Sequence, residues 1–187
     1  MPDSHSSAAT AGDQGWRRSA QEPSGVSLVE RVAAYPRPPA LVPCSRPIRV
    51  EVFGRVFCET SRSLRVLETF HPPTFYLPPE ACDASLLQPI SGRSFCEWKG
   101  SARYFDLVDP AANAPLPRRR RAVWHYPEPT PAFAPLAGWY ALYPALVDGC
   151  WLDGEPVQPQ PGGFYGGWIS ADLIGPFKGD PLHPELV

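Results

Sequence analysis

The segment Cys96-Glu97-Trp98-Lys99-Gly100 places a thiol, a carboxylate, an indole and an ammonium group in consecutive positions. Cys96 could be a nucleophile assisted by Lys99, because a nearby ammonium group stabilises a thiolate. Alternatively, Cys96 packs as a small apolar residue that closes a turn, since free cysteine is among the most buried residue types. The residue types alone are compatible with both roles.

Lys99 and Glu68 form a second candidate pair. Lys99 precedes a glycine in a predicted turn between strands, where its charge can point into a concave face. Glu68 follows Leu64 and Val66 with period two, so it shares their apolar face. Because an unpaired buried carboxylate is costly, we expect Lys99 to be its counter-ion. Such a pair is either structural or a proton donor and acceptor that flank a ligand.

Amphipathic aromatic side chains are dense in the middle of the chain. If several line one face, they form an apolar pocket with hydroxyl and indole donors, which is the usual composition of a small-ligand site. The alternative is the core of a small, proline-rich β domain. The candidate ligand-binding residues are Tyr76, Tyr104, Trp124, Tyr126 and Tyr143.

The elements that must position these residues are predicted to be short strands. Ile48–Val52 alternates with period two, Gly54-Arg55 supplies a turn, and 56–60 returns as the second strand of a hairpin. A strand, turn and strand are expected from 95 to 108 around Gly100. The 26 prolines exclude long helices over most of the chain. We therefore predict a mostly β, compact antiparallel domain with short helical turns and extended Pro-rich tails.

The 187 residues suit one domain with extensions. Ser27 fits a capping box that opens a short helix through Ala34. The predicted organisation is a disordered tail at 1–25, a short helix and Pro-rich arm at 26–47, a β domain at 48–157, and a Gly- and aromatic-rich extension at 158–187 that docks on the domain.

Charge and composition limit the partners. The net charge of −2 gives no global field toward nucleic acid, and we expect the run Arg118–Arg121 to be a solvated, Pro-bounded loop. The chain has neither an apolar h-region near its start nor a stretch of roughly 18 apolar residues, so we expect a soluble, cytoplasmic protein with no membrane contact. The sequence does not define the oligomeric state.

The cysteines and histidines do not suggest a metal or a disulfide framework. The five cysteines are widely separated, odd in number and never in C-x-x-C spacing, and the four histidines are scattered. We therefore expect no metal site. A P-loop and a G-x-G-x-x-G motif are also absent, and no cofactor can be assigned from the sequence.

Five motifs in order resemble one known family. The hairpin and strand from Val50 to Thr69 are similar to its opening segment, and the next four motifs follow in the same order. They are Pro72-Pro73-Thr74-Phe75-Tyr76-Leu77-Pro78, Cys96-x-x-Lys99-Gly100-x-Ala102-x-Tyr104, Trp124-x-Tyr126-Pro127-x-Pro129 and Tyr140-Ala141-Leu142-Tyr143-Pro144. Residues 48–157 thus resemble the DUF427 domain.

This resemblance implies a compact fold similar to the Mss4-like β-tent class, but no established activity. The family is sometimes labelled nucleotidyltransferase-like, yet Gly100-Ser101 is followed by Asp106 and Asp109, which lack Asp-x-Asp spacing. We predict that a concave β face binds a small ligand or peptide. This face is built around Glu68, Tyr76, Cys96, Lys99, Tyr104, Trp124 and Tyr126. The alternatives are an enzyme that uses Lys99 with Glu68, or Cys96, and a protein-protein interaction module.

Overall fold

The chain is built from short strands joined by tight turns and proline-rich loops. The computed structural model describes residues 29–186, so the tail predicted at 1–25 and the capping residue Ser27 lie outside the described residues. The strands are β1 (Glu30–Arg31), β2 (Ala40–Cys44), β3 (Ile48–Val52), β4 (Arg55–Thr60), β5 (Ser63–Leu67), β6 (Thr74–Tyr76), β7 (Leu87–Cys96), β8 (Gly100–Val108), β9 (Arg118–His125), β10 (Tyr140–Leu142), β11 (Gly149–Leu152), β12 (Glu155–Pro156), β13 (Gln158–Pro159), β14 (Trp168–Ile169) and β15 (Leu173–Ile174).

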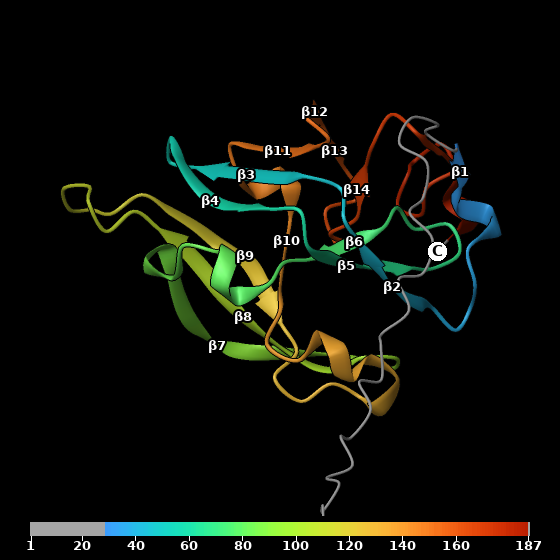
Figure 1. Cartoon of the computed structure of the whole chain (residues 1–187), viewed down its shortest axis with the longest axis horizontal. Helices are drawn as coiled ribbons and strands as arrows, with labels where there is room; N and C mark the ends of the chain where they lie inside the picture. Colours follow the sequence, from blue (N-terminus) through green and yellow to red (C-terminus); the bar gives the residue numbers. More distant parts are fainter. Residues whose placement is uncertain (1–28, 187) are drawn as a thin grey trace, which may run out of the picture.

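Three sheets form the body of the protein (Figure 1). One four-stranded sheet has the order β10-β9-β8-β7, a second has the order β12-β11-β3-β4, and a three-stranded sheet has the order β2-β5-β6. In Figure 1, β3, β4 and β11 lie above β7, β8 and β9, with β2, β5 and β6 to one side. All pairings within these sheets are antiparallel, which confirms the predicted mostly β, antiparallel class.

The helical content is low. Every helix within residues 29–186 is a short 3₁₀ turn, and five of the six begin with proline or alanine. These turns are Val32–Ala34, Pro79–Ala81, Ala84–Leu86, Pro131–Leu136, Pro144–Leu146 and Pro184–Leu186. No helix among the described residues is long and apolar enough to span a bilayer.

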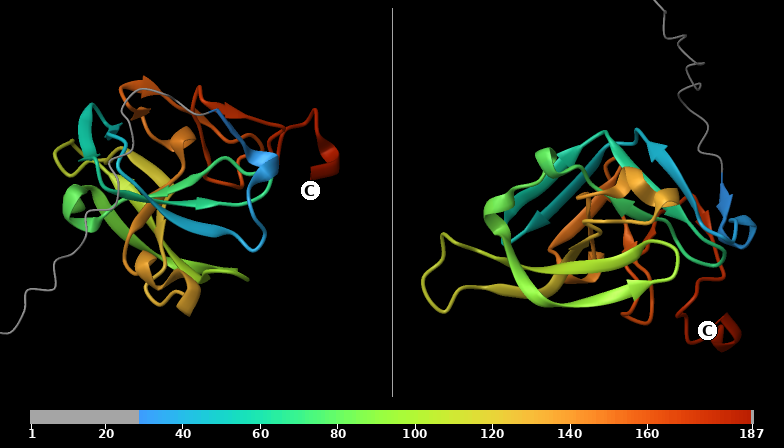
Figure 2. Two further views of the ribbon diagram at one scale, coloured as in Figure 1. Left: turned by 45° about the vertical axis from the view of Figure 1, so that its right-hand side comes forward. Right: turned by 90° about the horizontal axis from the view of Figure 1, so that it is seen from below.

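Two hairpins were predicted correctly. β3 and β4 pair across a two-residue turn, Phe53-Gly54, one residue earlier than the predicted Gly54-Arg55. Both turn residues have positive φ, the geometry of the tightest hairpin connections. β7 and β8 pair around Gly100. Figure 2 shows these two hairpins on different sides of the molecule, with the loop between β8 and β9 projecting from the body.

Two local predictions were wrong. Arg118–Arg121 is not a loop, because the run opens β9 and pairs with the long strand β8. A helix up to Ala34 does not form over the described residues. Instead, Glu30–Arg31 pairs in parallel with β15, and only the single 3₁₀ turn Val32–Ala34 follows. In both places, pairing with a distant strand outweighs the local sequence signal.

The larger apolar cluster, which we call the inter-sheet core, combines residues of both four-stranded sheets with parts of β6 and β14. Period-two alternation supplies its members from β3, where Ile48, Val50 and Val52 are buried and the residues between them are not. Its buried members are Ile48, Val50, Val52, Phe57, Cys58, Phe75, Leu77, Leu86, Leu107, Ala122, Val123, Leu142, Cys150, Leu152 and Trp168.

A smaller cluster, which we call the aromatic cluster, combines residues of β5, β6, β8, β9 and β10 with residues of the 3₁₀ turn Pro131–Leu136. β6 shows the division, because Phe75 packs in the inter-sheet core whereas the next residue, Tyr76, packs in the aromatic cluster. The buried members of the aromatic cluster are Val66, Tyr76, Ala102, Tyr104, Trp124, Tyr126, Phe133, Leu136 and Ala141.

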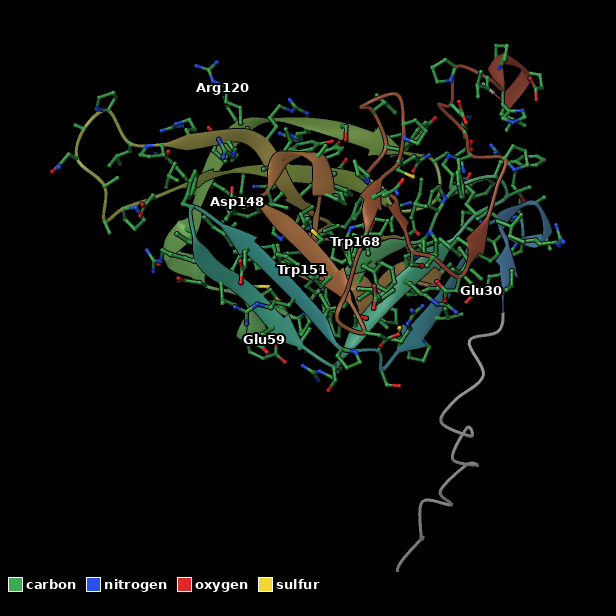
Figure 3. The ribbon with its side chains drawn as sticks, turned by 90° about the horizontal axis from the view of Figure 1, so that it is seen from above. Glu30, Glu59, Arg120, Asp148, Trp151 and Trp168 are labelled. Atoms are coloured by element: carbon green, nitrogen blue, oxygen red, sulfur yellow. The ribbon has the colours of Figure 1, made fainter. Side chains whose placement is uncertain are left out.

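The segment after β12 packs on this body. Trp168 is fully buried in the inter-sheet core, and its backbone N–H donates to the carbonyl of Pro73 at 2.9 Å. Figure 3 shows Trp168 within the body, whereas Arg120 extends away from it. Aromatic burial of this size anchors the C-terminal segment.

Candidate functional site

A cavity of about 430 Å³ opens beside the aromatic cluster, and we call it the tyrosine cavity. Its volume lies in the range of small-molecule sites. The residues that line it come from strands β5 to β9, from the β7–β8 turn, and from the loops that follow β5, β9, β10 and β13. All eight candidate residues are among them: Glu68, Tyr76, Cys96, Lys99, Tyr104, Trp124, Tyr126 and Tyr143.

β8 and β9 position the central aromatic pair. Tyr104 lies directly opposite Trp124 in the antiparallel register, a relationship that brings side chains together on one face. The Tyr104 hydroxyl shares a 2.7 Å hydrogen bond with Ser94 Oγ of β7. The Trp124 ring centroid is 4.7 Å from that of Tyr143. Neighbouring strands therefore hold this wall of the cavity in place.

β7 ends at Cys96, and the turn between β7 and β8 carries Lys99. Gly100 pairs with Cys96 across the turn and has a φ of +94°, a conformation that other residues rarely adopt. Thr130 secures the turn from the loop after β9. Its hydroxyl donates to the Trp98 carbonyl at 2.5 Å, and its N–H donates to the Lys99 carbonyl at 3.2 Å.

The ammonium group of Lys99 lies among aromatic rings. Its Nζ is 5.9 Å from the ring centroid of Tyr126 and 5.8 Å from that of Phe133, distances at which a cation is attracted to a ring face. Within residues 29–186, the Lys99 ammonium forms no ion pair. Its positive charge is therefore stabilised by rings but not neutralised.

The expected ion pair between Glu68 and Lys99 is not formed. The Glu68 carboxylate is instead 3.3 Å from the guanidinium of Arg37, which also lies 3.4 Å from Glu97 and over the Trp98 ring. Arg37 belongs to the arm between the first 3₁₀ turn and β2. A residue distant in sequence is therefore the counter-ion of Glu68, in place of the expected Lys99. Glu68 and Lys99 still line the same cavity.

The Cys96 thiol is half-buried and neighbours the Tyr126 hydroxyl. Burial raises the pKa of Tyr126, and the proximity of Tyr76 and Cys96 raises it further. Tyr126 is therefore a neutral hydrogen-bonding group. The position of Cys96 is compatible with packing, because the thiol contacts an aromatic residue, and with nucleophilic chemistry, because it lines the cavity.

Tyr76 is the most enclosed polar side chain of the wall. The residue is fully buried, and its hydroxyl makes no hydrogen bond of good geometry, although the Trp124 indole and the Tyr126 hydroxyl are near. Burial raises the pKa of Tyr76 well above its usual value, and these two neighbours oppose the rise only in part. The cavity wall therefore carries a neutral hydroxyl with unused hydrogen-bonding capacity.

His71 lines the cavity but was not among the candidate residues. Its Nδ1 donates to the Thr69 carbonyl at 2.9 Å, which leaves Nε2 as the acceptor nitrogen. Burial lowers its pKa and Lys178 and Lys99 lower it further, whereas Glu68 raises it. His71 is therefore neutral near pH 7. Its position three residues after Glu68 was the signal available in the sequence.

Arg121 is the second residue that the sequence analysis missed. It lies where the β8–β9 register shifts, between the pairs Phe105↔Val123 and Leu107↔Arg119, and it has a φ of +51°. Bulges of this kind redirect side chains next to functional sites. Arg121 lines the tyrosine cavity, and its guanidinium lies 4.0 Å from the Tyr104 ring centroid.

The glycine-flanked loop at 163–166 closes one side of the cavity. Tyr165 contacts the His71 ring edge-on at a centroid distance of 4.8 Å, and the Lys178 ammonium lies 5.5 Å from the Tyr165 ring. Gly166 leaves no room for a side chain, since a Cβ at this position would overlap the Trp124 ring. The density of glycine and aromatic residues in the sequence was the signal for this close approach.

A larger hollow lies on the outer face of β3 and β4, but it has a different character. It measures about 640 Å³ and is lined by Arg49, Glu59 and Trp151 among others. Arg49 forms ion pairs with Glu51 at 2.6 Å and with Glu59 at 3.1 Å, so its charge is already neutralised. Across residues 29–186, no group of three His, Cys, Asp or Glu side chains is placed to hold a metal ion.

The fold and the cavity define an antiparallel β domain with a pocket in which tyrosine is the most frequent lining residue. The chain belongs to the DUF427 family, because the sequence model of this domain of unknown function matches residues 40–153. No curated protein matches the sequence significantly. The matched range includes all eight candidate residues as well as His71 and Arg121, whereas the loop at 163–166 lies beyond it.

Proposed function

We propose that this DUF427 protein binds a small molecule or part of a peptide in the tyrosine cavity. The observation that carries the proposal is the cavity itself, a volume of about 430 Å³ in which the Lys99 ammonium lies among aromatic rings without an ion pair within residues 29–186. A concave site of this size, with aromatic walls and a few polar groups, is typical of small-molecule binding. The surrounding aromatic rings supply the apolar contact area.

Two exposed aromatic side chains at the cavity support a peptide as the alternative ligand. Phe95 and Phe164 both line the cavity and are 77% and 75% exposed. They extend its apolar lining to the molecular surface, where a partner chain could insert a side chain. The interaction-module alternative therefore uses the same site.

Binding can be tested by ligand-observed NMR with indole, phenol and benzoate as probes. We expect signals with the native protein and their loss in Thr74→Phe, because Thr74 lines the cavity and the added ring would fill it. The matched control is Thr60→Phe, which places the same ring in the outer hollow. Equal probe signals for both variants and the native protein would contradict the proposal.

The second candidate function is an enzyme, and one observation favours it. Lys99, Glu68 and His71 line a single cavity, so an ammonium group, a carboxylate and a neutral imidazole surround one ligand volume. Groups of this kind carry general acid-base catalysis when they reach the reacting atoms. In this version, His71 Nε2 is the candidate base and Lys99 the candidate acid.

The version with Cys96 as nucleophile has its own test. Cys44 and Cys96 are free cysteines of similar, intermediate exposure, so Cys44 is a matched reference. A nucleophilic Cys96 should react with iodoacetamide at pH 7 at least about tenfold faster than Cys44, since only the thiolate reacts. Equal rates measured by peptide mass spectrometry would leave Cys96 with a packing role.

We place this function in the cytoplasm, a location supported by five free cysteine thiols. We also retain the proposed organisation, in which the β domain at 48–157 contains the site and the extension at 158–187 completes it. The Mss4-like β-tent class is the fold that the family resemblance suggests for this domain.

A further inference from the structure

The positive charges around the tyrosine cavity point to the chemistry of its ligand. Among the residues of 29–186 that line the cavity, Glu68 is the only acid, and Arg37 neutralises it from outside at 3.3 Å. The bases Lys99 and Arg121 line the same cavity. The charges at the cavity therefore leave an excess of positive charge.

A backbone hydrogen bond to Asp106 fixes the position of Arg121. Its N–H donates to Asp106 Oδ1 at 2.8 Å, and the other oxygen of Asp106 accepts from Arg118 at 2.6 Å. A non-glycine residue with positive φ persists only where its surroundings enforce that conformation. The buried carboxylate of Asp106 does so here, and it thereby fixes where the Arg121 side chain leaves the strand.

Arg121 is also the arginine of its run that lines the cavity and remains unpaired. Arg118 pairs with Asp106, and Arg119 pairs with Asp148 at 3.3 Å. In the part of the chain from 29 to 186, Arg121 has no carboxylate partner, and its guanidinium stacks on Tyr104 instead. Stacking leaves the edge of the guanidinium, which carries the donors, free for an oxyanion.

Lys99 supplies a second cation from a different element. The β7–β8 turn fixes its backbone, and Tyr126 and Phe133 flank its ammonium group. His71 adds a neutral acceptor to the site, because burial lowers its pKa. A ligand that binds Lys99 and Arg121 must therefore bring its own negative charge.

We infer that the ligand of the tyrosine cavity is a small aromatic or heteroaromatic anion, whose carboxylate or phosphate group is bound by Arg121 and Lys99. The guanidinium fork matches both oxyanions in a bidentate manner. The aromatic body packs on Tyr104, Trp124 and Tyr143. This inference rests on the proposed function and specifies its ligand class.

The test uses matched probe pairs that differ in charge but not in shape. The pairs are benzoate with benzamide and indole-3-acetate with indole-3-acetamide, and phenyl phosphate represents the phosphate class. Affinities are measured by NMR titration with the full chain. We expect each carboxylate to bind at least about tenfold more tightly than its amide, the range of a charge-assisted hydrogen bond.

Three variants assign the effect to its residues. Arg121→Gln and Lys99→Met should each weaken the anions about tenfold and leave the amides within about twofold. Arg120→Gln is the control, because it removes the same charge from the neighbouring position, which lies outside the cavity and extends away from the body (Figure 3). It should change no affinity by more than about twofold. Thermal unfolding of each variant verifies folding.

The outcomes separate the two proposals. If amides bind as tightly as anions and the Arg121 and Lys99 variants change nothing, the anion inference fails while the ligand site stands. If no probe binds, or binding persists in Thr74→Phe, the proposed ligand site fails and the inference fails with it. Arg121→Lys distinguishes the oxyanions, since loss of the fork should weaken the planar carboxylates more than phenyl phosphate.

Discussion

Tyr76 and Leu77 are consecutive residues, both fully buried, yet they belong to regions with different properties. Leu77 packs in the inter-sheet core, where aliphatic side chains predominate. Tyr76 packs in the aromatic cluster beside a cavity, with a hydroxyl that lacks a hydrogen bond of good geometry. The comparison shows that burial alone does not separate a structural core from the proposed binding site. The cavity and the unpaired charges of Lys99 and Arg121 within residues 29–186 separate them.

The inter-sheet core contains one similar atom, which clarifies this criterion. The Trp168 indole N–H is also buried without a hydrogen bond. Trp168 does not line the tyrosine cavity, and its ring packs 5.0 Å from that of Phe75. An unsatisfied atom therefore suggests a ligand only where a cavity and unpaired charges accompany it.

The largest expected effect is on the stability of the inter-sheet core. Leu77→Ala should lower the free energy of unfolding by about 2–5 kcal/mol, because it removes buried methyl groups and leaves a cavity in a packed region. Urea unfolding measures this change. A loss below about 1 kcal/mol would mean that this core is less tightly packed than its burial indicates.

The turn that carries Lys99 should show the next largest effect. Gly100→Ala should cost about 1–3 kcal/mol, because alanine is strained at a φ of +94°. Ser101→Ala, one residue further on β8 and exposed, should stay within about 0.5 kcal/mol. If both variants unfold at the same urea concentration, the turn does not constrain Lys99.

The sequence predicted the features of the two regions that depend on local patterns. Period-two alternation located the β3–β4 hairpin, and the glycine at 100 located the β7–β8 turn. Alternation also explains why Tyr104 shares a wall with Trp124, since both lie on equivalent faces of paired strands. The eight candidate residues therefore line one cavity.

The parts that depend on distant pairing were not predictable. The partner of Glu68 is Arg37, 31 positions earlier, because the arm before β2 returns to the end of β5. Arg121 enters the site only because the register between β8 and β9 shifts there. Local sequence patterns indicate neither that the proline-rich arm supplies a counter-ion nor that a bulge occurs at Arg121.

Tyr76→Phe tests the Tyr76 hydroxyl that lacks a hydrogen bond. Unlike Leu77→Ala and Gly100→Ala, this variant should not destabilise the protein. Removing a buried hydroxyl without a hydrogen bond should leave stability unchanged or raise it by up to about 1 kcal/mol. The control is Tyr104→Phe, which removes the 2.7 Å hydrogen bond with Ser94 and should lower stability by about 1 kcal/mol. If Tyr76→Phe destabilises the protein as much as the control, its hydroxyl is satisfied in solution.

The smallest expected effect on stability is a pH dependence to which both regions contribute. Burial lowers the pKa of His71 at the cavity and of His125, which packs on Phe105 and Tyr140 at the inter-sheet core. As pH falls through the unfolded value of about 6.5, the unfolded state binds these protons first, so the free energy of unfolding falls. His71→Asn and His125→Asn should each reduce that fall between pH 7 and 5.5.

Binding should distinguish the two histidines where stability does not. An anion in the cavity favours protonated His71, so it raises the pKa of that imidazole and, by linkage, binds more tightly as pH falls from 7 to 5.5. His71→Asn should abolish this increase in indole-3-acetate affinity, because asparagine has no proton to gain in this range. His125→Asn should retain it, since His125 does not line the cavity. Loss of the increase in both variants would mean that the pH dependence arises from the whole fold rather than from the site.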